Sequence, residues 1–132
     1  MAPRSTILIA NHDPAVAEFF SDALISQAYA VRLHSSSQIS ADEVARVQPD
    51  LLILGIDHTN RGRTLQLVAE MHAHAKTSTI PILFSATNVD TLADVAIQCH
   101  YRCGTLLVPC HLDQFYERVS ETIDIRVCTC LD

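Results

Sequence analysis

Polar and ionisable side chains follow several short apolar runs of the sequence, and these residues could do chemistry. Five of them offer nitrogen, sulfur or carboxylate ligands: His12, Asp57, His58, Cys110 and His111. Imidazole and thiolate groups suit zinc and other transition metals better than magnesium. The sequence contains no compact C-x-x-C or H-E-x-x-H motif, so the spacing supports such a site only weakly. We expect no bound metal, and keep a metal site built from these five residues as an alternative.

Ser85 is the candidate nucleophile, because it follows the apolar run 80–84. No G-x-S-x-G motif surrounds it, and no general base is identifiable from spacing. The three glycines, Gly55, Gly62 and Gly104, form no G-x-G pattern that could hold a phosphate group. The sequence therefore predicts a protein that is not an enzyme. A small flavodoxin-like enzyme that depends on Ser85 is kept as an alternative.

The elements that must position these residues alternate along the chain. Five apolar runs predict strands, over 7–10, 29–33, 51–54, 80–84 and 105–108. Five segments have helical periodicity, over 14–28, 41–47, 63–75, 90–103 and 112–124. The alternation implies right-handed crossovers and a parallel sheet with helices on both faces. We therefore predict a doubly wound α/β domain, with the functional edge at the carboxyl ends of the strands.

Local signals refine this picture at two places. Asp13 directly precedes Pro14, a pair typical of a helix N-cap and first turn, so we expect Asp13 to cap the first helix and not to bind metal. Cys99 and Cys103 are four residues apart on a predicted helix and should share one face, with Cys99 in the core.

Composition limits the class of protein. The 132 residues suffice for one domain, which we place at 1–124, followed by a C-terminal tail at 125–132. A formal charge of -6 disfavours binding to nucleic acids and anionic membranes. No apolar stretch approaches the roughly 20 residues that span a bilayer, and the five cysteines have irregular spacing, so we expect a cytoplasmic protein with reduced thiols.

The sequence resembles the receiver domains of bacterial two-component response regulators over nearly its whole length. The segments that carry the resemblance are "ILIANHDPAVAEFFSDAL", "VQPDLLILGI", "TSTIPILFSA" and "CGTLLVPCHLDQFYERV". The resemblance implies a CheY-like, flavodoxin-like sheet of five strands in the order 2-1-3-4-5, with its working edge where the first and third strands are neighbours.

The resemblance also shows where this chain departs from the family. Receivers use two acidic residues that hold magnesium, an aspartate that accepts the phosphoryl group, and a lysine. Those four positions align with Asn11, His12, Gly55 and Val108. Only the hydroxyl position and the proline after the lysine position keep the pattern, at Ser85 and Pro109.

Loss of all four charged residues predicts a pseudo-receiver. Gly55 cannot be phosphorylated, and the nitrogen of His12 is a poor ligand for magnesium. Asp57 could replace the phosphoacceptor, but two residues along a strand displace it by roughly 6 to 7 Å.

The resemblance suggests a regulatory function. We expect a receiver-like signalling module that binds a protein partner, a signalling protein or kinase, independently of aspartyl phosphorylation. The family's fourth helix, fifth strand and fifth helix often form homodimer or partner interfaces, which here would include Val95, Arg102, Gln114, Tyr116 and Arg118. Docking of a kinase between the first and last helices is a second possibility. The alternative function is a receiver-derived sensor of metal or thiol redox state that uses the histidines and cysteines at the strand ends.

Overall fold

The computed structural model describes residues 5–34, 39–57, 59–98 and 103–128. Its five strands are β1 (Thr6–Ala10), β2 (Ala30–His34), β3 (Leu51–Gly55), β4 (Ile82–Ala86) and β5 (Cys103–Leu107). The helices are α1 (Pro14–Ser26), α2 (Ala41–Val47), α3 (Arg61–Ala73), α4 (Val89–Gln98) and α5 (Leu112–Cys128). All strand pairs are parallel and the sheet order is β2-β1-β3-β4-β5. The predicted flavodoxin-like fold is confirmed.

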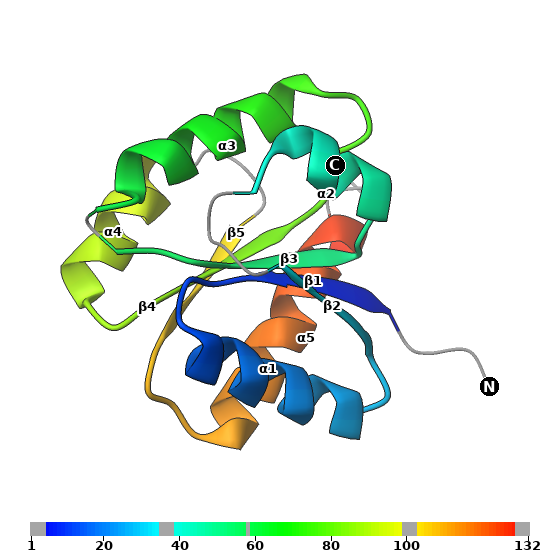
Figure 1. The fold of residues 1–132 in the computed structure, drawn as a ribbon, viewed down its shortest axis with the longest axis vertical. Helices are drawn as coiled ribbons and strands as arrows, with labels where there is room; N and C mark the ends of the chain where they lie inside the picture. The colour runs from blue at the N-terminus through cyan, green and yellow to red at the C-terminus, as the bar shows by residue number, and fades with distance from the viewer. Residues whose placement is uncertain (1–4, 35–38, 58, 99–102, 129–132) are drawn as a thin grey trace.

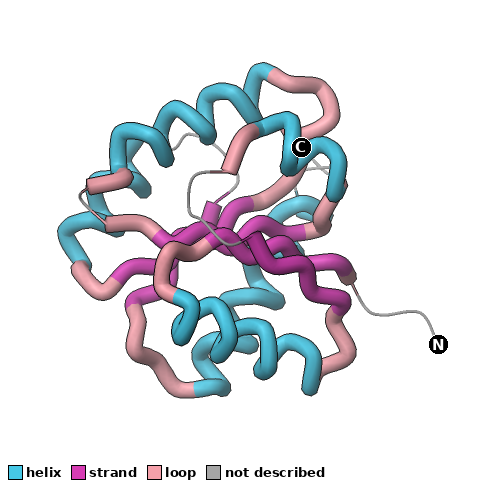
Figure 2. Tube along the Cα trace, viewed as in Figure 1, coloured by secondary structure: helices cyan, strands magenta, loops and turns pink. Residues whose placement is uncertain are grey.

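Helices cover both faces of the sheet, as Figures 1 and 2 show. Alternate residues of each central strand point to opposite faces, so each face has its own core. One core joins residues of α2, α3 and α4 to the sheet, and the other joins α1 and α5 to it. Strands β3 and β4 are buried throughout, which explains their continuous apolar sequence.

The carboxyl ends of the strands meet at one edge of the sheet, on the left in Figure 1. Gly55 at the end of β3 is the register partner of Ser85 in β4, and Ala10 at the end of β1 is the partner of Leu54. Side chains that follow β1, β3 and β4 are therefore brought to a common edge, as predicted.

Asp13 caps α1 as expected, because its side chain accepts a hydrogen bond from the backbone N–H of Ala15 at 3.0 Å. Gln48 ends α2 in the left-handed backbone conformation, with φ of 51°. No helix within the described ranges has the length and apolar character that a membrane span requires.

The helix predicted over 90–103 is wrong at its end. Helix α4 stops at Gln98, and Cys103 opens β5, where it is the register partner of Ile82. Cys99 and Cys103 therefore do not share a helix face; Cys99 itself lies outside the described residues. Pairing with β4 decides the conformation at Cys103, and local helical periodicity does not.

The last helix continues further than predicted. Helix α5 ends at Cys128, whereas the periodicity had suggested Asp124. Residues 125–128 are thus helical, although the sequence placed them in the tail. The rest of that tail, 129–132, lies outside the described residues.

Candidate functional site

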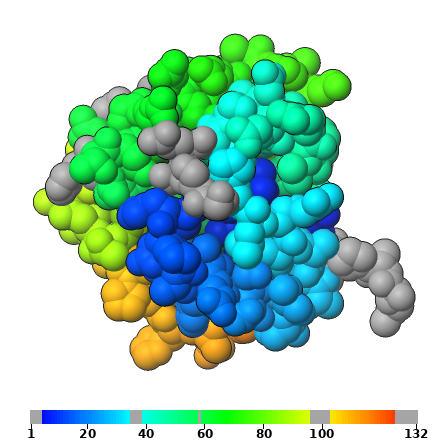
Figure 3. All heavy atoms as spheres, viewed as in Figure 1, coloured from blue at the N-terminus to red at the C-terminus, as the bar shows by residue number. Residues whose placement is uncertain are grey.

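A pocket of about 310 Å³ lies at the carboxyl edge of the sheet. It is lined by the ends of β3 and β4, by the segments that follow β1, β3, β4 and β5, and by one residue of α1: Asn11, His12, Asp13, Val16, Gly55, Ile56, Asp57, Ser85, Ala86, Thr87 and Val108. In the space-filling view of Figure 3, the dark blue atoms of the β1–α1 segment lie beside green atoms near the start of α3. Of the six positions that the resemblance assigns to the receiver-like edge, all except Pro109 line this pocket.

Asn11 fills the space beside Gly55. A Cβ atom placed on Gly55 would lie 2.5 Å from Asn11 Nδ2 and 2.7 Å from Asn11 Cγ. Asn11 is buried, and its Oδ1 accepts a hydrogen bond from the backbone N–H of Asp13 at 2.9 Å. The side chain of residue 11 thus occupies the place where a side chain at position 55 would begin.

Ser85 has a buried hydroxyl group without a hydrogen-bond partner. The residue is 2% exposed, and its Oγ atom makes no hydrogen bond to any described residue. Its backbone is well anchored, because its carbonyl accepts from the N–H of Ile56 at 2.8 Å. A buried hydroxyl that lacks a partner costs free energy, so the unpaired Oγ atom marks the position where a ligand group would be favoured.

Asp57 organises the loop between β3 and α3. Its Oδ1 accepts hydrogen bonds from Thr59 Oγ1 at 2.6 Å, from Thr59 N at 2.8 Å and from Asn60 N at 3.0 Å. The hydrogen bond from the Thr59 hydroxyl is the main reason why the pKa of Asp57 lies below its usual value of 3.8, and the two backbone N–H groups and His12 lower it further. Partial burial opposes this shift. Ordering this loop is therefore enough to explain a carboxylate at residue 57.

Asn60 is a residue that the sequence reasoning missed. Its side chain accepts from the backbone N–H of Asp57 at 2.8 Å and donates to the carbonyl of Gly55 at 3.2 Å. It is buried and directly precedes α3. An asparagine before a predicted helix was an available signal, since such residues commonly bond nearby backbone groups.

Of the five predicted alternative metal ligands, the structure brings His12 and Asp57 together. His12 Nε2 lies 3.4 Å from Asp57 Oδ2, and both side chains are exposed. His58 lies outside the described residues. No three His, Cys, Asp or Glu side chains of the described ranges are arranged to hold a metal ion, so Cys110 and His111 complete no such site there. Cys110 instead packs against the α1/α5 core, and burial raises the pKa of its thiol.

Val108 and Pro109 directly follow β5 at the edge where the strands end. The backbone N–H of Val108 donates to the carbonyl of Ala86 at 2.9 Å, and its side chain packs partly against the α1/α5 core. The peptide bond to Pro109 is cis, and Pro109 is exposed. An apolar side chain thus lines the pocket at the position that the resemblance assigns to lysine.

The predicted interface residues do not form one surface. Val95 is fully buried in the α2/α3/α4 core, so its assignment to an interface is wrong: it lies on the inner face of α4. Tyr116 is half-buried on the side of α1, with its hydroxyl 3.3 Å from Ser26 Oγ. Gln114 and Arg118 are exposed as expected, and Arg102 lies outside the described residues.

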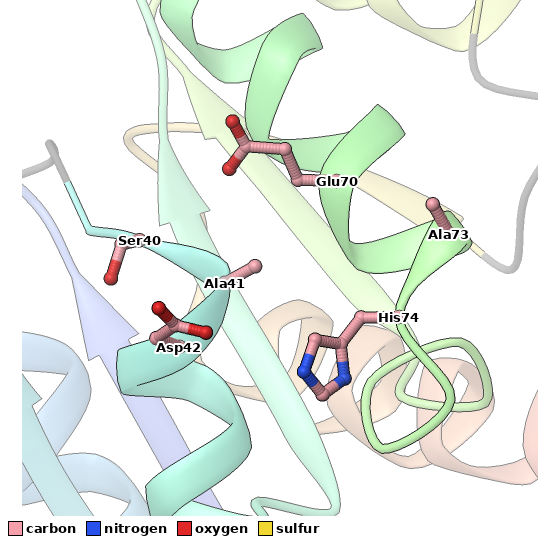
Figure 4. Close-up of a pocket in the computed structure, with 6 residues that line it drawn as sticks. All are labelled: Ser40, Ala41, Asp42, Glu70, Ala73 and His74. Carbon is pink, nitrogen blue, oxygen red and sulfur yellow. The ribbon is translucent and has the colours of Figure 1, made fainter.

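A second pocket, of about 360 Å³, lies between the start of α2 and the end of α3. Figure 4 shows Asp42 in the first turn of α2, across the gap from Glu70 and His74. None of the residues that line it belongs to the pocket at the strand ends. This second pocket is therefore separate from the receiver-like edge.

Comparison with solved structures identifies the fold. A response regulator from Thermotoga maritima has a TM-score of 0.75 at 17% identity, covering 94% of this chain and 99% of that one. A provisionally assigned response regulator from Chloroflexus aurantiacus has a TM-score of 0.74 at 26% identity, covering 92% and 98%. The receiver domain of a sensor histidine kinase from Pseudomonas aeruginosa, which holds magnesium in its active-site cleft, has a TM-score of 0.74 at 16% identity, covering 90% and 97%.

No protein-family model and no curated protein matches the sequence. The structural likeness nevertheless extends over most of each chain and agrees with the observed strand order. This chain has the CheY-like fold of response regulator receiver domains.

Proposed function

We propose that this protein is a pseudo-receiver: a cytoplasmic signalling module of a two-component pathway that acts by binding a protein partner, without phosphorylation of its own edge. The similarity to receiver domains supports the signalling context. The observation that supports action without phosphorylation is the close approach of Asn11 to Gly55. Gly55 has no carboxylate, and Asn11 occupies the space into which a side chain would extend.

The remaining side chains of the pocket supply no lysine or arginine, and its two carboxylates, Asp13 and Asp57, already accept local hydrogen bonds. Magnesium prefers several oxygen ligands in octahedral geometry, and a transferring phosphoryl group needs positive charge to neutralise it. Asn11 uses its carbonyl oxygen to accept from Asp13 N, and no lysine or arginine lines the pocket. The pocket at the end of the strands is therefore suited to binding and not to phosphoryl chemistry.

Asp57 is a poor replacement phosphoacceptor. One of its carboxylate oxygens already accepts three hydrogen bonds that shape the loop before α3. Phosphorylation of its other oxygen, Oδ2, would turn Oδ1 into the carbonyl oxygen of an acyl phosphate, which is a weaker acceptor for these three bonds than a carboxylate oxygen. The lowered pKa of Asp57 also reflects a carboxylate stabilised in its ionised form, which makes it a weaker nucleophile.

Two exposed surfaces are candidates for binding a protein partner or a second copy of the chain. The first consists of α4, β5 and α5, where Val89 and Leu107 are exposed apolar side chains and Gln114 and Arg118 are exposed polar ones. The second lies between α1 and α5, where Phe19 is 43% exposed and contacts Phe115 with ring centroids 6.3 Å apart. Exposed aromatic and aliphatic groups of this kind favour partner binding.

Native mass spectrometry tests the proposal. The full chain is incubated with magnesium and acetyl phosphate beside a receiver that retains its phosphoacceptor aspartate. The expected spectrum of this protein shows no mass increase under conditions that phosphorylate the control receiver. A phosphoryl adduct that disappears in Asp57→Asn would overturn the proposal, because it would locate a working phosphoacceptor at residue 57.

A further inference from the structure

The pocket at the strand ends combines features that select a ligand group by its charge. Its walls include four apolar side chains, Val16, Ile56, Ala86 and Val108. The carboxylates of Asp13 and Asp57 line it as well, and it has no lysine or arginine among its lining residues. The whole chain also carries a formal charge of -6. An anion would meet two carboxylates here without a fixed counter-charge, whereas a cation would be attracted.

Ser85 supplies an independent observation that points to a ligand. Ser85 lines the pocket, and its Oγ atom is buried and makes no hydrogen bond to a described residue. Such a hydroxyl can accept a hydrogen bond from an entering N–H group, which offsets the cost of its burial. The pocket thus offers a specific acceptor and not only diffuse negative charge.

Asp57 retains one oxygen for such a ligand. Its Oδ1 holds the loop before α3, while the contact of its Oδ2 within the described residues is His12 Nε2 at 3.4 Å. Both partners of this contact are exposed, so the pairing is weak in water. A cation that enters the pocket can therefore approach Oδ2 without breaking the hydrogen bonds that Oδ1 makes in the loop before α3.

We propose that this pocket binds the side chain of a lysine presented by a protein partner. The aliphatic stem would lie along the apolar walls, and the ammonium group would donate to Ser85 Oγ and be attracted by Asp57. Long basic side chains commonly bury their stem in this way while the charged end reaches polar groups. The inference rests on the proposed partner-binding function and specifies the partner's chemistry.

A titration followed by ¹H–¹⁵N NMR tests the proposal on the full chain. The probe is Nα-acetyl-lysine methylamide, and the matched control is the same compound with its side-chain nitrogen acetylated, which keeps the stem and removes the charge. The expected result is saturable shifts at Asn11, Gly55 and Ser85 with the charged probe, and binding weaker by at least about tenfold with the acetylated one. Equal binding of the two probes, or no saturable shifts at these amides, would overturn the proposal.

Variants and further probes sharpen the test. Ser85→Ala should weaken binding of the charged probe, whereas Ser85→Thr, which keeps a hydroxyl, should retain it. If inorganic phosphate shifted the same amides at lower concentrations than the charged probe, the pocket would be an anion site and the proposal would be wrong. Tighter binding of free lysine than of the blocked probe would indicate a metabolite site and would equally overturn a partner's side chain as the occupant.

The outcome is independent of the test of the proposed function. Failure of the lysine probe to bind would leave the unphosphorylated module unaffected. A phosphoryl adduct in the mass spectrum would overturn the proposed phosphorylation-independent function, whether or not the lysine probe binds.

Discussion

Asn11 and Gly55 compete for the same volume at the end of the sheet. The nearest approach of a Cβ atom at residue 55 to Asn11 would be 2.5 Å, far closer than carbon and nitrogen atoms tolerate. Asn11 is held in place by the hydrogen bond from Asp13 N to its Oδ1. A side chain at position 55 therefore requires Asn11 to rotate and to release that bond.

Gly55→Ala should lower the free energy of unfolding by about 1 kcal/mol, since the lost hydrogen bond and the tighter packing outweigh the entropy gained in the unfolded chain. In an Asn11→Ala background the same substitution should be neutral or stabilising by about 0.5 kcal/mol. Urea unfolding of the four proteins measures the coupling. Equal effects of Gly55→Ala in both backgrounds would show that the two side chains do not compete.

Ser85→Ala should leave stability unchanged or raise the free energy of unfolding by about 1 kcal/mol, because it removes a buried hydroxyl that lacks a partner. The matched control is Thr77→Val, which removes a buried hydroxyl that donates to the carbonyl of Met71 at 2.7 Å. That control should lose about 1 kcal/mol. A loss at Ser85 as large as the loss at Thr77 would show that the Ser85 hydroxyl is bonded in solution.

Asp57→Ala should lower the free energy of unfolding by about 1 to 2 kcal/mol at pH 7, because the loop before α3 loses its acceptor. The folded-state pKa of Asp57 lies below the usual value of 3.8, so its ionised form stabilises the fold above that pH. The contribution disappears as the pH falls through the folded-state pKa.

Unfolding by urea at pH 7, 5 and 3 measures this dependence. The difference between wild type and Asp57→Ala should be constant from pH 7 to pH 5 and smaller at pH 3. Asp22→Ala, which removes an exposed carboxylate from α1, serves as the control. A difference that grew as the pH fell would contradict the assigned direction of the shift.

The sequence predicted the fold because apolar runs and helical periods are local patterns repeated ten times along the chain. It also placed Gly55 and Ser85 at one edge, since parallel strands end together. It could not predict that the side chain of Asn11 lies against Gly55, because this depends on the rotamer of Asn11 and on the pairing of β1 with β3, which are far apart in the sequence. Val95 was assigned to an interface by analogy with the family, whereas it packs inward with Leu92, as the apolar face of an amphipathic helix does. At Cys103, pairing with β4 overrode the helical periodicity.

Gly104→Ala should lower the free energy of unfolding by about 1 to 3 kcal/mol, because it separates α5 from β5. A Cβ atom at residue 104 would lie 2.6 Å from Thr122 Oγ1, which is buried and donates to the carbonyl of Arg118 at 2.6 Å. Thermal unfolding measures the loss. In a Thr122→Ala background the cost should fall markedly, whereas an unchanged cost would place the strain elsewhere.

Restoring the receiver residues should restore phosphorylation only when they are introduced together. Gly55→Asp alone supplies a carboxylate that meets Asn11, and it lacks acidic residues at positions 11 and 12 and a lysine at position 108, so it should gain no phosphoryl adduct from acetyl phosphate. The combination of Gly55→Asp with Asn11→Asp, His12→Asp and Val108→Lys supplies carboxylates for magnesium and positive charge for the phosphoryl group. Mass spectrometry with and without magnesium should detect a magnesium-dependent adduct in this variant alone. An adduct on Gly55→Asp alone would mean that the pocket at the strand ends had kept phosphoryl chemistry without its charged residues.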